Sequence, residues 1–205
     1  YASAEGLPRT LVVTSSQAGE GKTTTSQTLA REFAGLGRRV LLIDADLRRP
    51  TLHRIMADKT TEGLTALLAG EKTVDQVIVR SDYANLDYIS ALPIPPAPSA
   101  LLATADFRGL IDQMLTRYDT IIFDAPPVLG LSDAPVVSTN VDAVLMVIDA
   151  AAGRRGAAKS ALRRLEMVNA PVIGAILTKF DARAAGGEYS YYGADYYAYS
   201  ASDSR

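Results

Sequence analysis

The residues best suited to chemistry near the start of the chain form a glycine-rich loop, Ser16–Thr23. Glycines at positions 19 and 21 let backbone N–H groups converge on phosphate oxygens, a geometry that a Cβ atom would obstruct. The ammonium group of Lys22 can reach β- and γ-phosphates, and the hydroxyl of Thr23 can bind Mg²⁺. A helix that begins near Lys22 adds its positive N-terminal end. The residues predicted to bind the phosphates of a nucleotide such as ATP are Ala18, Gly19, Glu20, Gly21, Lys22, Thr23 and Thr24.

Three aspartates follow apolar runs farther along the chain. Asp44 and Asp46 come after Val40–Ile43, and Asp124 comes after Thr120–Phe123. Alternation along an extended chain places Asp44 and Asp46 on the same side of the backbone. Two carboxylates there repel each other unless a cation lies between them, which Mg²⁺ bound to ATP supplies. Asp124 is expected to hold the metal through water, although a helix-capping role for Asp46 alone stays open. The predicted metal-binding residues are Thr23, Asp44, Asp46 and Asp124.

A catalytic set for phosphate transfer follows from these residues. One carboxylate is within reach to accept a proton from an acceptor hydroxyl, and the sequence leaves open whether it is Asp44 or Asp46. Arg48 could steady a phosphate or pair with an acid, and we favour the phosphate. The predicted catalytic residues are Lys22, Asp44, Asp46 and Arg48.

The elements that must position these residues alternate between strands and helices. Helices are expected over Lys22–Leu36, closed by Gly37, and over Ser99–Arg117 and Gly156–Val168. Between the helices lie apolar runs of strand length. Every position in these runs is apolar or nearly so, as in strands that are buried on both faces of a parallel sheet. Strands of this kind that alternate with helices predict an α/β fold with a mostly parallel sheet. The expected strands are Thr10–Thr14, Val40–Ile43, Thr120–Phe123, Ala143–Ile148 and Val172–Leu177. Ligands of such sheets bind beyond the carboxyl ends of the strands.

Tyrosines crowd the end of the chain after the periodicity stops at Ala182. The sequence predicts a catalytic domain over residues 1–181 and a flexible tail over residues 182–205. A Tyr/Gly/Ser tract could be a plain linker, but next to an ATP site we interpret it as the phosphate acceptor. The predicted acceptors are Tyr189, Tyr191, Tyr192, Tyr196, Tyr197 and Tyr199.

Composition excludes several classes of protein. A net charge of -2 over 205 residues gives no electrostatic reason to expect nucleic-acid binding. The chain has no cysteine, which excludes a disulfide framework, and no apolar run of membrane-spanning length. It opens at Tyr1 without an initiator methionine, so we expect a fragment or a processed product.

The motifs resemble those of bacterial tyrosine kinases, the autokinase domains of capsule and exopolysaccharide export systems. Walker A corresponds to Ser15–Thr23, Walker A′ to Leu41–Arg48 and Walker B to Ile121–Pro127, and the tyrosine cluster stands where the family keeps its autophosphorylation sites. The resemblance implies a P-loop NTPase fold of the deviant Walker A, MinD-like branch. Thr178 stands where an asparagine of the family commonly approaches the adenine, beside Lys179.

The resemblance also implies partners and a location. It implies transphosphorylation in a ring oligomer, a transmembrane co-polymerase activator that is fused upstream or separate, and a tyrosine phosphatase. The location implied is cytoplasmic, at the inner face of the inner membrane. The Glu-x-x-Arg-x-x-Arg helix that builds the family's ring does not precede Thr10, so we expect this fragment to be largely monomeric.

Two alternatives use the same fold. Partition and septum-site ATPases carry a signature lysine early in the Walker A loop, where this chain has Gln17. A catalytically inactive scaffold would bind nucleotide only as a structural ligand, yet Lys22, Thr23, Asp44 and Asp124 are all intact. The sequence favours an ATP-dependent tyrosine autokinase over both.

Overall fold

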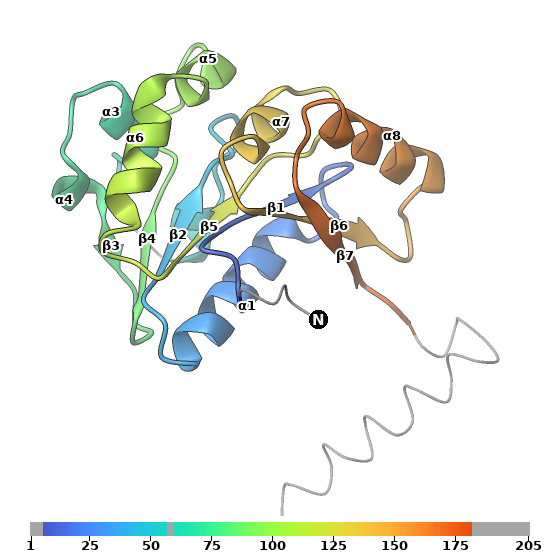
Figure 1. Cartoon of the computed structure of the whole chain (residues 1–205), viewed down its shortest axis with the longest axis horizontal. Coiled ribbons are helices and arrows are strands. Elements are labelled where there is room, and N and C mark those ends of the chain that lie inside the picture. Colours follow the sequence, from blue (N-terminus) through green and yellow to red (C-terminus); the bar gives the residue numbers. More distant parts are fainter. Residues whose placement is uncertain (1–5, 57–59, 182–205) are drawn as a thin grey trace, which may run out of the picture.

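The structure is a computed structural model and describes residues 6–56 and 60–181. Over these ranges the chain forms one seven-stranded sheet in the order β3-β4-β2-β5-β1-β6-β7 (Figure 1). Neighbouring strands are parallel except β3, which is antiparallel to β4. The predicted mostly parallel α/β architecture is therefore confirmed. The strands are β1 (Thr10–Ser15), β2 (Val40–Asp44), β3 (Val79–Arg80), β4 (Leu86–Ile89), β5 (Thr120–Asp124), β6 (Ala143–Asp149) and β7 (Val172–Thr178).

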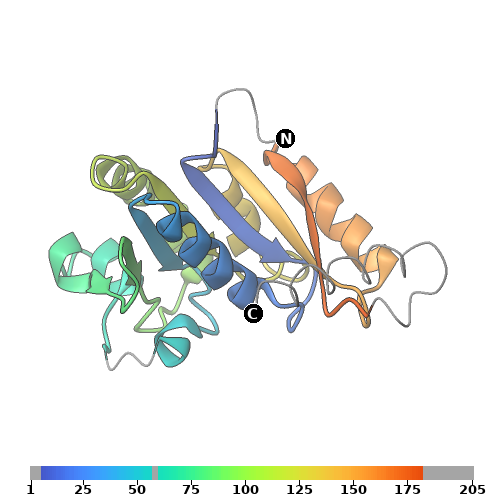
Figure 2. The ribbon, with the colours of Figure 1, turned by 90° about the horizontal axis from the view of Figure 1, so that it is seen from below.

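Helices cover both faces of the sheet (Figure 2). The core cluster on one face includes residues of α1 and α2, and the cluster on the other includes residues of α3 to α8. The helices are α1 (Lys22–Gly35), α2 (Leu52–Ile55), α3 (Leu64–Leu68), α4 (Val74–Val77), α5 (Pro98–Leu102), α6 (Ala105–Met114), α7 (Asp133–Ser138) and α8 (Arg155–Glu166). Strands at the centre are buried on both faces, which is why β1, β2 and β5 need apolar residues at successive positions.

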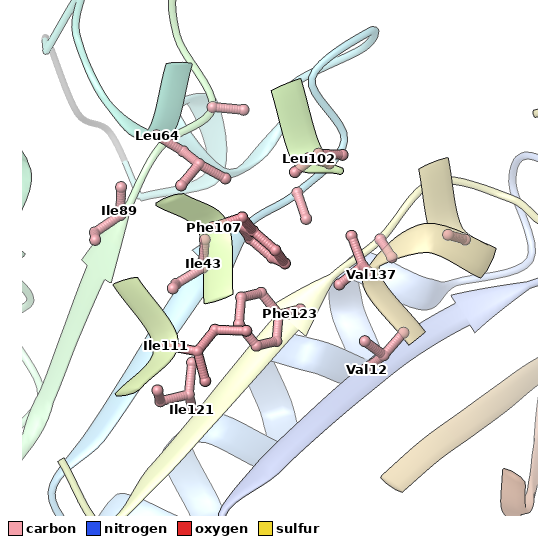
Figure 3. Packing of buried hydrophobic residues seen from close by; sticks show 14 of the residues in the cluster. Val12, Ile43, Leu64, Ile89, Leu102, Phe107, Ile111, Ile121, Phe123 and Val137 are labelled. Atoms are coloured by element: carbon pink, nitrogen blue, oxygen red, sulfur yellow. The ribbon is translucent and has the colours of Figure 1, made fainter. Parts of the chain in front are cut away.

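The larger core cluster centres on β5 and α6 (Figure 3). The rings of Phe107 and Phe123 are tilted against each other with centroids 5.7 Å apart, and both side chains are fully buried. This packing fixes the position of β5, whose last residue is Asp124.

The sheet order brings the chemically important residues to one edge. Because β2 and β5 are parallel neighbours, Asp44 lies opposite Asp124 in the register. On the other side of β5, Val13 of β1 pairs with Asp124, and β1 leads into the glycine-rich loop. The loop and both aspartates therefore meet at the carboxyl ends of three adjacent strands, where ligands of this architecture bind.

Two sequence-based expectations about elements are wrong. The helix expected over Ser99–Arg117 is two helices, because Thr104 is extended with ψ 157° between α5 and α6. The run Val172–Leu177 does form a strand, but it is an edge strand and is not buried on both faces. Ile173 and Leu177 are 62% and 57% exposed among the described residues.

Candidate active site

The loop between β1 and α1 has the conformation that the glycines predicted. Gly19 and Gly21 have φ values of 83° and 95°, in the left-handed region that glycine enters without strain. The buried carboxylate of Glu20 accepts hydrogen bonds from the Ser16 hydroxyl and the Gln17 N–H, both 2.8 Å from its Oε2. The side chain of Glu20 thus stabilises the conformation of the loop. Its predicted contact with phosphate can therefore come only from its backbone.

A cavity of about 840 Å³ opens over this loop. Its volume is in the range of small-molecule and cofactor sites. The walls come from the loop, from the segments that follow β2 and β5, and from Lys179 after β7. Of the predicted site residues, those that line the cavity are Ala18, Gly19, Gly21, Lys22, Thr23, Thr24, Asp46 and Arg48.

The ammonium group of Lys22 lies between two carboxylates. Its Nζ is 3.2 Å from Asp46 Oδ2 and 3.8 Å from Asp124 Oδ1. Burial disfavours the charged form of Lys22, but Asp124, Asp46 and Asp44 outweigh that effect and raise its pKa above the ordinary lysine value. Lys22 is therefore a permanent cation at the floor of the cavity.

Asp44 is fully buried beneath the cavity, whereas Asp46 faces it. The carboxylate of Asp44 accepts backbone hydrogen bonds from Asp46, Thr51 and Leu52 at 3.0–3.1 Å. Burial, followed by the charge of Asp124, raises the pKa of Asp44 to about 7. Asp44 has the pKa that suits a general base at neutral pH, and Asp46 has the position that suits contact with a ligand.

Asp124 has the features of a group that holds a cation. It is fully buried, and its Oδ2 is a buried oxygen without a hydrogen-bond partner. Burial raises the pKa of Asp124, and the nearby charge of Lys22 offsets this only in part. An unpartnered buried oxygen is costly unless a ligand contacts it. Together with Asp46 and the Thr23 hydroxyl, this donor set fits Mg²⁺, which prefers oxygen ligands and keeps several waters.

Protein side chains alone do not form a complete metal site there. Within the described ranges, no group of three or more His, Cys, Asp or Glu side chains could hold a metal ion. Mg²⁺ at phosphate sites commonly takes oxygens from one or two carboxylates, from the bound phosphates and from water.

Arg48 pairs with an acid that the sequence analysis did not single out for this role. Its Nε is 2.6 Å from Oδ2 of Asp133, the first residue of α7. Asp133 also accepts a 2.5 Å hydrogen bond from the hydroxyl of Ser99 in α5. Arg48 still lines the cavity, so the ion pair fixes its guanidinium group beside the ligand space. A direct contact with phosphate stays a prediction.

Two further aspartates matter to the site. Asp133 orients Arg48, and Asp149 ends β6 and binds Lys179 at 2.7 Å. Asp149 ends its strand as Asp44 and Asp124 end theirs, and this position was the signal that could have identified it. Asp133 is joined to Arg48 only by the fold.

Some predictions lie outside the described residues. The six candidate acceptor tyrosines are all among residues 182–205. In the part of the chain that the structure covers, no helix combines the length and the apolar character required to cross a bilayer.

Replacing Asp124 with asparagine should stabilise the nucleotide-free protein and weaken its response to Mg²⁺. Because folding raises the pKa of Asp124, the folded state binds its proton more tightly than the unfolded state, so the ionised group destabilises the fold as pH rises above the usual carboxyl range. The gain in thermal midpoint should therefore be larger at pH 8 than at pH 4. Thermal melts with and without Mg²⁺-ATP measure both effects. A lower midpoint at pH 8, or an undiminished Mg²⁺ response, would contradict the assignment.

Comparisons with known proteins agree with this geometry. Residues 8–169 match the family model described as an AAA domain. The chain is 35% identical over 193 residues to the tyrosine-protein kinase YwqD of Bacillus subtilis, covering 94% of this chain and 81% of that protein. The kinase domain of the Escherichia coli tyrosine kinase ETK superposes with a TM-score of 0.80 at 35% identity, covering 83% of this chain and 67% of that one.

The septum-site alternative is more distant. The septum site-determining protein MinD of Pyrococcus horikoshii, solved with Mg-ADP, has a TM-score of 0.70 at 21% identity, covering 82% of this chain and 69% of that one. At that identity the likeness concerns the P-loop fold alone. The coverage and identity of the tyrosine-kinase relatives, with the strand-tip site described above, show that the chain belongs to the bacterial tyrosine-protein kinase family.

Proposed function

We propose that this protein is an ATP-dependent protein-tyrosine autokinase that transfers the γ-phosphate to tyrosines of its own C-terminal tail. The observation that carries the proposal is the meeting of Lys22, Asp46 and Asp124 at the tips of three adjacent strands, below an 840 Å³ cavity. This arrangement provides a cation for phosphate charge and oxygens for Mg²⁺ at one place. The family relationship supports tyrosine as the acceptor.

Each residue of the cavity has a role in phosphate transfer under this proposal. The loop N–H groups bind the phosphates, and Lys22 leaves its carboxylate partners to contact the β–γ bridge. Thr23, Asp46 and Asp124 would hold Mg²⁺, which when bound neutralises charge on the γ-phosphate. The acceptor hydroxyl loses its proton to a carboxylate of the Asp44–Asp46 pair and its oxygen bonds to the γ-phosphorus. The bond from that phosphorus to the β–γ bridging oxygen breaks, and ADP leaves. A free tyrosine hydroxyl has a pKa of about 10, so it needs such a base at neutral pH.

Asp44 is the better candidate for the base by pKa and Asp46 the better candidate by position. The two carboxylates differ in their contacts. Asp46 contacts Lys22 at the cavity surface, whereas Asp44 is held by three backbone N–H groups. Acting as a base would require Asp44 to give up part of that bonding when the segment after β2 moves.

Tyrosines of the folded domain are poor acceptors. Tyr88 and Tyr118 are 3% and 6% exposed. The hydroxyl of Tyr118 donates a 2.7 Å hydrogen bond to Asp87, and burial, then this bond, raises its pKa well above the ordinary tyrosine value, so it is a weak nucleophile. Tyr83 is 46% exposed but lies under the guanidinium of Arg31. This leaves the tail, residues 182–205, as the proposed acceptor domain beside the catalytic domain of residues 1–181.

The wider setting is part of the proposal. Transfer between neighbouring molecules in a ring, a membrane-bound activator and an opposing tyrosine phosphatase fit the family, as does a place at the cytoplasmic face of the inner membrane. One relative, the tyrosine-protein kinase wzc of Salmonella typhi, matches 96% of this chain but only 27% of its own length. Its additional sequence supports an activator that is fused in some relatives. Regulation of exopolysaccharide or capsule synthesis is the proposed purpose.

The test is where the phosphate goes when the purified chain is given γ-labelled ATP and Mg²⁺. A kinase labels tyrosine, a partition-type ATPase releases phosphate to water, and a nucleotide-binding scaffold does neither. Mixing a Lys22→Met protein, which keeps its tail, with an active protein shortened to residues 1–181 tests transfer between molecules. Label should appear on the Lys22→Met protein. An unlabelled Lys22→Met protein beside a self-labelling full chain would indicate transfer within one molecule.

A further inference from the structure

Two successive residues at the end of β7 bind two successive carbonyl groups of the phosphate loop. The hydroxyl of Thr178 donates a 2.6 Å hydrogen bond to the carbonyl oxygen of Glu20. The ammonium group of Lys179 donates a 2.8 Å hydrogen bond to the carbonyl oxygen of Gly19. The donors and acceptors are about 160 residues apart in the sequence, so only the fold joins them.

These two bonds fix the direction in which the loop presents its N–H groups. In a planar trans peptide, the carbonyl of one residue and the N–H of the next point in opposite directions. Holding the carbonyls of Gly19 and Glu20 against β7 therefore turns the N–H groups of Glu20 and Gly21 away from β7. Converging N–H groups of successive residues are what bind a phosphate oxygen.

Lys179 is itself held in place. Its Nζ is 2.7 Å from Oδ2 of Asp149, while Oδ1 of Asp149 accepts the N–H groups of Ala151 and Ala152 at 2.9 Å. The bond from Lys179, then the backbone bonds, keep the pKa of Asp149 below its usual range. Lys179 has a φ of 51°, a region that residues other than glycine seldom occupy. Such a conformation persists where surrounding contacts fix it, as Gly19 and Asp149 do here.

The methyl group of Thr178 also limits the size of the residue that can occupy position 21 of the loop. A Cβ atom built on Gly21 would be 3.3 Å from Cγ2 of Thr178, at a φ of 95° that already favours glycine. The end of β7 therefore hydrogen-bonds to the loop and leaves little room for a side chain at position 21.

We propose that Thr178 and Lys179 are positioning residues that orient the loop N–H groups of Glu20 and Gly21 toward the triphosphate. Asp149 supports them by fixing the Lys179 ammonium. Their contribution is to phosphate binding and is separate from any contact with the adenine ring of ATP. The inference rests on the proposed function, because it requires that the triphosphate bind at this loop.

The experiment measures competition against ATP by two inhibitors, inorganic tripolyphosphate and adenosine, in single-residue variants of the full chain. Lys179→Met keeps the aliphatic stem and loses the ammonium group, and Thr178→Val keeps the contact with Gly21 and loses the hydroxyl. Each variant should weaken tripolyphosphate inhibition and raise the KM for ATP by roughly tenfold, the change that about 1.4 kcal/mol produces. Adenosine inhibition and kcat should stay within about twofold of the parent values.

Matched controls are Lys159→Met, at an exposed position in α8, and Thr116→Val, whose hydroxyl binds a carbonyl far from the loop in sequence, that of Gln113. Both should behave as the parent. Lys179→Arg, which can still donate to Gly19, should restore much of the tripolyphosphate inhibition.

Unchanged tripolyphosphate inhibition in Lys179→Met and Thr178→Val would overturn the inference. An equal loss of adenosine inhibition would also overturn it. That result would mean that the two residues contact the adenine, or that the variants disturb the structure of the whole nucleotide site. Lys22→Met distinguishes failure of the positioning role from failure of the proposed site. Because this variant is expected to be nearly inactive, its competition is measured as displacement of bound labelled ATP by tripolyphosphate, with the parent protein measured in the same way. If Lys22→Met leaves this displacement unchanged, the proposed site is wrong; if it weakens the displacement while Lys179→Met and Thr178→Val do not, only the positioning role fails.

Discussion

A Lys22→Met protein is expected to lose phosphate transfer to tyrosine and ATP hydrolysis by roughly a hundredfold to a thousandfold, the usual cost of losing one charge-stabilising donor. Lys22 is the cation of the loop that can stabilise the negative charge that develops on the oxygen between the β- and γ-phosphates. Its ammonium lies 3.2 Å from Asp46 and 3.8 Å from Asp124, so the variant also leaves two carboxylates facing each other without their counter-ion. Transfer of γ-labelled phosphate and release of free phosphate measure the two activities.

Circular dichroism should show a folded Lys22→Met protein, because Lys22 lies on a loop-to-helix junction and contributes little to either core cluster. The exposed Lys159→Met variant serves as the control and should keep the parental rate. Phosphorylation near the parental rate in Lys22→Met would show that another group neutralises the γ-phosphate.

Replacing all six tail tyrosines with phenylalanine should remove nearly all phosphate incorporation and leave ATP binding intact. The tail offers several hydroxyl groups to one site, so no single tyrosine should be essential. The single variant Tyr192→Phe should therefore lower total phosphate only slightly. The substituted residues are Tyr189, Tyr191, Tyr192, Tyr196, Tyr197 and Tyr199.

Mass spectrometry identifies the modified residues in the same samples. Tyr83→Phe is the control, because Tyr83 is the most exposed tyrosine that the structure describes and should not carry phosphate. Phosphate on Tyr83, Tyr88 or Tyr118 at parental levels in the six-fold variant would contradict the assignment of the tail.

The parts of the site that are local in sequence could be predicted from it. The glycines, Lys22 and Thr23 lie within a few residues of one another, and the apolar runs before Asp44 and Asp124 marked buried strands. Relations that depend on the fold could not be predicted. Arg48 meets Asp133 across 85 residues of chain, and no local pattern shows that pairing.

The short helices could not be predicted from the sequence pattern either. Helices α2, α3 and α4 have 4 or 5 residues each, about one turn, so they have no helical periodicity to detect. The exposure of β7 was missed for a different reason. Its residues are as apolar as those of a central strand, and only the strand order shows that it lies at the edge.

The pairing of Lys22 with Asp46 and Asp124 makes nucleotide binding an exchange of ions. A triphosphate that arrives alone takes the lysine from its carboxylates and leaves two negative charges uncompensated in a buried setting. A metal ion that arrives alone competes with the lysine for the same oxygens. Only when both arrive does each charge find a new counter-ion, so metal and nucleotide should each raise the affinity for the other by the same factor. Such reciprocal coupling would make the site respond to the Mg²⁺ complex of ATP as one ligand.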